Sequence, residues 1–268
     1  MIIICKNCGN QFEGNFCNQC GQKAATKPFR FKDVLLDVTH NVLDVDKGFL
    51  HNARDLTLHP APTIDAYLAG KRVVYYGWFK YLFLTISIAT VITFYSNSLQ
   101  EVIGGFSEGY QKEEAATSQA QQKLNELLFS YFNLFYLAYL PFLSVFSYWF
   151  FRKYTLMEHV VASALIIAQS NIFYILLFTP LLFLENLPFY ESLYLGIYLF
   201  SLTIFLVYQV VVQVQLFKRT SYLKTTLKGL LVFILSYLFY VLAISILVAI
   251  ISAVYLDGVA YIDITFTD

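Results

Sequence analysis

The sequence predicts an all-α polytopic membrane protein with five transmembrane helices, a small N-terminal zinc ribbon and cytoplasmic amphipathic helices. Three observations lead to this fold class. Apolar residues make up 58% of the 268 residues and charged residues only 13%, a composition too apolar for a soluble domain. The charged residues are grouped between long uncharged segments, and all four cysteines lie near the N-terminus.

Five uncharged segments are long enough to cross a bilayer; in order they contain 20, 25, 25, 26 and 28 residues. A helix rises about 1.5 Å per residue, so about 20 apolar residues cross a hydrocarbon core about 30 Å thick. We therefore expect a transmembrane bundle from 78 to 256, followed by a tail from 257 to 268. Its spans are expected at about 79–98, 127–151, 160–184, 192–217 and 229–256.

Basic residues predict the orientation of this bundle. Ten of the 18 Lys and Arg residues precede the first span, and most of the others lie between spans two and three or between spans four and five. The remaining loops and the tail are mainly acidic. Because short basic loops stay in the cytoplasm, we expect a cytoplasmic N-terminus and a C-terminus outside. We expect no cleavable signal peptide, since the cysteines follow Ile4 directly.

The segment from 1 to 24 carries two CxxC pairs, Cys5 with Cys8 and Cys17 with Cys20. In a reducing compartment, two such pairs indicate a metal site rather than disulfides. Two CxxC turns supply four thiolates at the corners of the tetrahedron that Zn²⁺ prefers. Since all four ligands are cysteines, no coordination position is open, and we predict a structural zinc ion.

The residues around the cysteines predict the local fold of this ribbon. Gly9 and Gly21 each follow the second cysteine of a pair, where the turn often needs the positive φ that glycine adopts readily. Gly14 is expected to join a short hairpin between Gln11–Phe12 and Asn15–Phe16, with both rings covering the metal.

Two kinds of partner are open for such a ribbon, a protein or a nucleic acid. A closed structural site favours a small folded unit that docks a protein. Nucleic-acid binding requires a strongly basic surface, and the nearby basic residues form only a mild patch: Lys6, Lys23, Lys27 and Arg30. We therefore expect a protein partner and do not expect nucleic acid.

The segment from 25 to 77 is predicted to form juxtamembrane amphipathic helices. From Phe31 to Val45, apolar residues recur at helical spacing opposite an acidic face, which favours packing on protein over binding to anionic lipid. A second helix begins near Asp46 and ends before Pro60 and Pro62. One or two further turns from Thr63 are expected to end at Gly70 in a left-handed cap.

The CxxCG…FCxxCG opening, the Tyr67-Leu68-Ala69-Gly70-Lys71-Arg72 segment and the apolar remainder together resemble a family of bacterial multi-pass inner-membrane proteins. That family joins a four-Cys zinc ribbon to a juxtamembrane Tyr-x-x-Gly-Lys-Arg motif, and the similarity spans nearly the whole chain. The resemblance implies the order of parts and an inner-membrane location; it implies no activity, because the family has none established. Val73-Val74 departs from its pattern, in which further basic residues are common, and this weakens a role in lipid-headgroup binding.

Amides inside the predicted spans form a candidate intramembrane polar site: Gln169, Asn171, Gln209 and Gln213. Neutral amides in membranes most often form hydrogen bonds between helices, worth about 0.6 to 2 kcal/mol each. The alternative is that they line a polar pathway. Gln209 and Gln213 lie one turn apart and therefore on one face of their helix.

Glu158 and His159 form a second candidate site at the cytoplasmic end of span three, beside Arg152 and Lys153. A carboxylate next to an imidazole can relay protons. At the interface, however, water and the nearby cations are expected to satisfy both groups.

Known catalytic motifs are absent from the sequence: it has no GxSxG, phosphate-binding loop or HExxH, and its four histidines are scattered. We therefore expect no enzyme. The favoured hypothesis is a membrane scaffold or accessory subunit whose zinc ribbon and acidic helices dock a protein partner. One alternative is a transporter or channel for a small or lipid-like solute that uses the polar residues of spans three and four. A second is a membrane-tethered regulator that binds nucleic acid.

Overall fold

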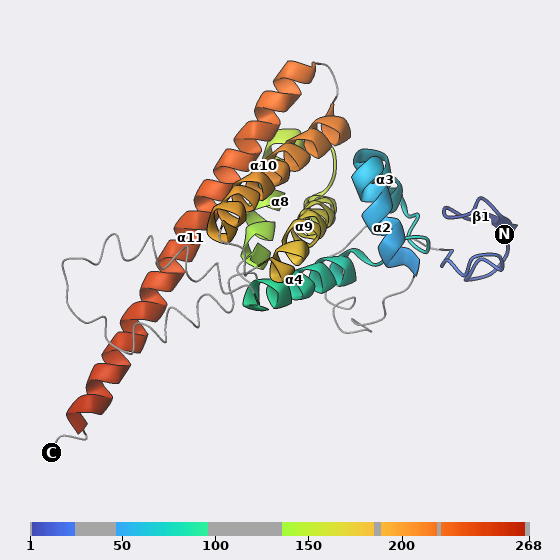
Figure 1. The fold of residues 1–268 in the computed structure, drawn as a ribbon. Helices are drawn as coiled ribbons and strands as arrows, with labels where there is room; N and C mark the ends of the chain where they lie inside the picture. Colours follow the sequence, from blue (N-terminus) through green and yellow to red (C-terminus); the bar gives the residue numbers. More distant parts are fainter. Residues whose placement is uncertain (1, 25–46, 96–135, 185–188, 219–220, 266–268) are drawn as a thin grey trace.

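The computed structural model describes residues 2–24, 47–95, 136–184, 189–218 and 221–265 (Figure 1). The predicted acidic helix from 31 to 45 and the predicted outside loop between the first two spans lie outside the described residues. The elements are β1 (Ile3–Ile4), β2 (Gln11–Phe12), α2 (Lys47–Leu58), α3 (Pro60–Ala69), α4 (Trp78–Tyr95), η1 (Tyr136–Ala138), α8 (Tyr139–Phe151), α9 (Leu156–Phe178), η2 (Thr179–Phe183), α10 (Tyr190–Phe217) and α11 (Tyr222–Thr265).

Three stretches in the described part of the chain are long and apolar enough to cross a membrane: Leu156–Phe183, Ser192–Phe217 and Tyr222–Ile251. They coincide with the last three predicted spans and indicate a membrane protein. Two shorter apolar helices, Trp78–Thr93 and Tyr139–Phe151, overlap the first two predicted spans. The first nine residues of predicted span two, 127–135, lie outside the described residues.

Helix α9 is the centre of the bundle. It packs against α4, α8 and α10, whereas α11 packs on α8 and α10 at the edge of the bundle (Figure 1). Every residue from Val161 to Gln169 is buried, so this half of α9 is enclosed on all sides. A helix that is apolar all round requires such an environment.

The segment predicted as juxtamembrane packs into the bundle itself. Leu56 of α2 and Ile64 and Tyr67 of α3 belong to the same apolar core as α4, α8, α9 and α10. The hydroxyl of Tyr208 on α10 donates to the backbone C=O of Leu56 at 2.9 Å. Helices α2 and α3 are therefore part of the wall around α9 and α10.

Most element ends follow local sequence rules. Gly70 ends α3 with a φ of 113°, which confirms the predicted left-handed cap. Helix α3 begins at Pro60, not at Thr63 as predicted, because proline is well suited to the first turn, where its missing N–H is not needed. Helix α11 continues to Thr265 and so includes most of the segment predicted as a tail from 257.

Candidate metal centre and buried polar sites

The four thiols of Cys5, Cys8, Cys17 and Cys20 lie within 4.8 Å of one another. The sulfurs of Cys5 and Cys20 are 3.5 Å apart, and those of Cys8 and Cys17 are 3.6 Å apart. A disulfide requires about 2.05 Å, whereas a tetrahedron with metal–sulfur bonds of about 2.3 Å has edges of about 3.8 Å. The four cysteines thus fit a metal ion, as predicted from their spacing.

The two CxxC turns have the same backbone structure. In the first, the N–H of Gly9 donates to the C=O of Cys5 at 2.9 Å, and the N–H of Cys5 donates to the C=O of Asn10 at 2.8 Å. The second turn repeats both bonds with Gly21, Cys17 and Gln22. The φ angles of 77° at Gly9 and 73° at Gly21 confirm the prediction that glycine is needed at these positions.

The predicted hairpin around Gly14 is wrong. Strand β2 pairs with β1, with Ile3 opposite Phe12, because the first CxxC turn itself reverses the chain. Across the second turn, Phe16 faces Lys23 in the same way. Phe12 packs against Cys5 and Cys17, but Phe16 is 57% exposed. Of the two rings predicted to cover the metal, only that of Phe12 packs on the cysteines.

The thiols are crowded enough to disturb one another's ionisation. For Cys17, burial raises the pKa, but the backbone N–H groups of Cys20 and Gln19 outweigh it and hold the pKa at about 6. For Cys8, the N–H of Asn10 lowers the pKa, but burial and the neighbouring cysteine sulfurs raise it to about 12. Four thiolates cannot all be charged at this distance without a cation, so the donor set fits a bound metal ion.

The ribbon is attached to the bundle through the side chain of Gln22, which is buried. Its Nε2 donates to the C=O of Gly70 at 2.8 Å, and its Oε1 accepts from the N–H of Arg72 at 3.2 Å. The backbone C=O of the same residue closes the second CxxC turn by accepting from Cys17. Gln22 therefore connects the metal-binding turn directly to the Gly-Lys-Arg part of the juxtamembrane motif.

Gln22→Ala is expected to release this attachment while leaving the metal bound, because its backbone still closes the turn. Two lost hydrogen bonds, at about 0.5 to 1.5 kcal/mol each, predict that the Arg72 amide exchanges hydrogen about tenfold faster or more. Hydrogen exchange followed by mass spectrometry, together with the metal content, measures both. Gln19→Ala, an exposed position in the same turn, is the matched control and should change neither.

Gln169 is a hydrogen-bond junction between three helices. Its Oε1 accepts from the hydroxyl of Tyr81 on α4 at 2.7 Å. Its Nε2 donates to the hydroxyl of Thr57 at 2.7 Å and to the C=O of Ala53 at 3.2 Å, both on α2. This is the arrangement expected of an amide that joins neighbouring helices.

Gln209 and Gln213 form a separate polar group facing α8 and α11. The hydroxyl of Tyr139 on α8 contacts Gln209 Oε1 at 3.1 Å and the hydroxyl of Ser236 on α11 at 3.0 Å. Gln209 Nε2 and Gln213 Oε1 are buried and have no hydrogen-bond partner among the described residues. Gln213 Oε1 lies against Gly229. Within the described chain, the predicted polar site is thus two groups with different partners.

Asn171 is less enclosed than the three glutamines. Its Nδ2 is buried without a hydrogen-bond partner in the described part of the chain.

Glu158 and His159 have separate partners. Glu158 Oε2 accepts from the backbone N–H of Thr155 at 2.8 Å, and Thr155 Oγ1 accepts from the N–H of Glu158 at 3.3 Å, forming a capping box. His159 is fully buried rather than solvated; Nδ1 lies 2.9 Å from Ser147 Oγ, and the ring stacks on Phe217. Although these two residues are adjacent in sequence, the Glu158 side chain caps the start of α9, whereas the His159 side chain is buried in the bundle.

Thr155→Ala is expected to destabilise the protein by about 1 kcal/mol, the usual effect of losing a helix N-cap. A thermal unfolding midpoint in detergent measures it. Thr203→Ala is the control: Thr203 is exposed in mid-helix, and in the described part of the chain its hydroxyl bonds to its own helix at Leu199. An equal loss in both variants would contradict a capping role for Thr155.

Comparisons with models of protein families, with curated proteins and with solved structures find no match to this chain.

Several residues that hold these sites together were not predicted from the sequence. Gln22 and Asn52 are polar residues outside the spans and carry no pattern of their own; each uses its amide to bind the backbone of a distant loop. Tyr81 and Tyr139 are hidden among 21 tyrosines. The sequence feature that could have identified them is their position: each lies inside a predicted span, where a hydroxyl needs a hydrogen-bond partner.

Proposed function

We propose that this protein is a non-enzymatic membrane scaffold or accessory subunit in a bacterial inner membrane, with its zinc ribbon docking a protein partner. It crosses the membrane five times, with the N-terminus in the cytoplasm and the C-terminus outside. The observation that carries this proposal is the closed four-thiol cluster attached through Gln22 to the loop at Gly70 and Arg72. A closed thiolate site leaves no position for a substrate and favours zinc in a structural role.

The surface of the ribbon supports a protein partner. Ile2 and Ile4 are 66% and 65% exposed, and Phe16 is 57% exposed, although the ribbon comprises only the first 24 residues. Apolar side chains exposed on so small a unit are characteristic of a surface that another protein covers. Since Gln22 holds the ribbon on the bundle, such a partner would be bound next to the membrane.

The five-span topology is supported by the position of the basic loops, which lie at one end of the helix bundle. Lys153, in the loop between α8 and α9, donates to the C=O of Leu216 near the end of α10 at 2.8 Å. Lys153 also pairs with Asp65 of α3 at 3.3 Å. These contacts place the basic loops before α9 and after α10 at one end of the bundle, the arrangement expected of the cytoplasmic side.

Co-purification from native membranes in mild detergent tests the scaffold proposal. We expect one partner at constant stoichiometry, lost when Ile4 and Phe16 are both replaced by Glu and retained in a control with Leu50→Glu. Leu50 is exposed on α2 and is not part of the ribbon. A partner bound equally by all three proteins, or a monodisperse protein without one, would contradict the proposal.

A second candidate function, a transporter or channel for a small neutral solute, is favoured by two buried atoms of Gln209 and Gln213 that have no hydrogen-bond partner among the described residues. One is a donor and the other an acceptor, so together they match a solute that offers both. Gln209→Leu with Gln213→Leu should then abolish the swelling of proteoliposomes in glycerol or urea, whereas Gln215→Leu, an exposed position on the same helix, should not. If proteoliposomes with the unmodified protein do not swell, this candidate function is excluded.

A further inference from the structure

Helix α2 lies against the middle of two membrane-length helices. Its residues Ala53 and Thr57 bind Gln169, which is midway along the apolar stretch Leu156–Phe183. Its Leu56 accepts a hydrogen bond from Tyr208, which lies well inside the stretch Ser192–Phe217. If these stretches cross a membrane, as proposed above, α2 lies deep within its thickness.

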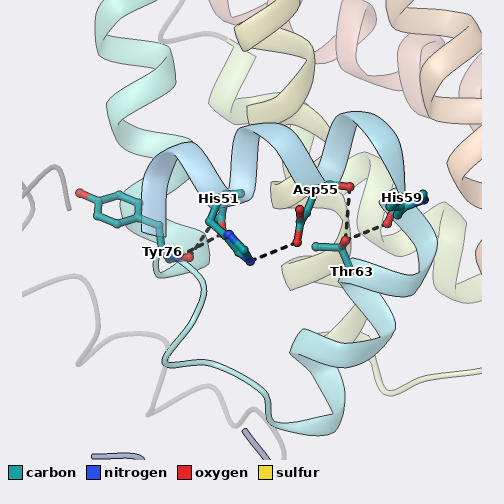
Figure 2. Close-up of polar contacts among 6 residues, drawn as sticks. His51, Asp55, His59, Thr63 and Tyr76 are labelled. Atoms are coloured by element: carbon teal, nitrogen blue, oxygen red, sulfur yellow. Dashed lines mark hydrogen bonds and ion pairs between the residues drawn. The ribbon is translucent and has the colours of Figure 1, made fainter. Parts of the chain in front are cut away.

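The face of α2 that points away from the bundle carries ionisable side chains, beside the exposed Leu50 and Leu58. His51 Nε2 pairs with Asp55 Oδ2 at 3.2 Å, and their side chains are 39% and 24% exposed (Figure 2). Arg54, between them, is exposed. Asn52 and Leu56 of the same helix are buried on the opposite face. An ionisable group in contact with lipid at this depth costs about 2.5 to 3.5 kcal/mol or more, so this face requires a different environment.

The ion pair is braced by the elements around it. The side-chain amide of Asn52 donates to the C=O of Tyr76 at 3.0 Å and accepts from its N–H at 3.1 Å (Figure 2). These two hydrogen bonds fix the loop before α4. They hold Tyr75 with its ring centre 5.5 Å from that of His51. Burial, and then the charge of Asp55, raise the pKa of Tyr75, so its phenol stays protonated.

The turn from α2 into α3 is held in the same way. The hydroxyl of Thr63 donates to the C=O groups of His59 and Asp55, at 2.7 and 3.3 Å (Figure 2). The backbone around the ion pair is therefore satisfied by side chains. His51 and Asp55 stay on the outward face in a fixed arrangement with Tyr75.

We propose that the outward face of α2 is a water-contacting surface at membrane depth, at which small hydrophilic solutes reach the His51–Asp55 pair from the cytoplasmic side. The proposal rests on the membrane spans proposed above. Its direction follows from Asp65 of α3, which binds Lys153 and the hydroxyl of Tyr154 in the loop before α9, at the end of the bundle that carries the basic loops. Water at this face satisfies the ionisable groups that lipid cannot.

Reaction of introduced cysteines with a membrane-impermeant sulfonated maleimide tests this surface. In full-length protein in vesicles with the cytoplasmic side outward, Arg54→Cys is expected to react as fast as after solubilisation in detergent. Val207→Cys is the matched control, because Val207 is 49% exposed on α10 and is adjacent to Tyr208; it should react only after solubilisation. Peptide mapping separates both positions from the native cysteines, and vesicles of opposite orientation should leave position 54 unlabelled.

The outcomes separate the two proposals. Labelling at 54 without labelling at 207 supports the water-contacting surface. Labelling at neither position overturns it and leaves the spans intact. Labelling at 207 in sealed vesicles shows that α10 does not face lipid, which overturns the proposed spans and this inference with them. Leu50→Cys, exposed on the same helix, repeats the test should Arg54→Cys fail to fold.

Discussion

Cys17→Ser is expected to abolish metal binding and to unfold residues 2–24 while the bundle remains in the membrane. Cys17 is one of the four clustered thiols, and its N–H also holds the turn closed at Gln22. The described ribbon buries few apolar residues besides its cysteines, so a bound metal ion is expected to supply most of its stability; structural zinc contributes about 10 to 16 kcal/mol in small domains. Metal content and hydrogen exchange along the chain measure the effect.

Loss of the ribbon should also be detectable at a distance. Because Gln22 is attached to Gly70 and Arg72, the Arg72 amide is expected to lose protection in Cys17→Ser, as in Gln22→Ala, whereas α9 keeps its protection. Gln19→Ser is the control, since Gln19 is exposed and is not a ligand. A Cys17→Ser protein with full metal content and a protected ribbon would show that the four-thiol site is not what folds this segment.

Gln169→Leu is expected to destabilise the bundle by about 1 to 4 kcal/mol, the sum of three interhelical hydrogen bonds at about 0.6 to 2 kcal/mol each, reduced by the apolar gain of leucine. It removes the contacts to Tyr81, Thr57 and Ala53, and it leaves the Tyr81 hydroxyl buried without its acceptor. Unfolding in increasing SDS, followed by circular dichroism, measures the change.

Gln213→Leu is the matched control, with the same substitution at an equally buried glutamine. Gln213 Oε1 has no partner among the described residues, so replacing it is expected to be neutral or stabilising. Equal destabilisation in both variants would mean that buried volume, and not hydrogen bonding, determines the effect. Greater destabilisation by Gln213→Leu would indicate a polar ligand at that position.

The metal site was predictable because its signal is local. Four cysteines at fixed short spacing leave few arrangements, and the glycines after each pair mark turns that require positive φ. The strand pairing was mispredicted because Gly14, with a φ of 107°, also resembles a hairpin turn. Which strands pair depends on the reversal of the chain at each metal-binding turn, and residue types alone do not show this.

The sequence predicted that the buried polar residues need hydrogen-bond partners, but it did not predict which residues those partners are. An amide inside an apolar span needs a partner, and Gln169 has one. That two of its three partners come from α2, more than 100 positions earlier in the chain, depends on how α2 packs. His159 shows the same limit: beside Glu158 it resembled an interfacial pair, yet helix rotation buries it against Ser147 and Phe217.

The sequence by itself determined the apolar helices, the four-cysteine site and the ends of several elements. These features follow from composition, from hydropathy over windows of about 20 residues and from glycine and proline at fixed positions. Only the tertiary structure decided that α2 and α3 join the bundle and that Gln22 fastens the ribbon to the loop at Gly70. Those contacts join residues far apart in the chain, and their energy comes from packing and paired amides that no short stretch contains.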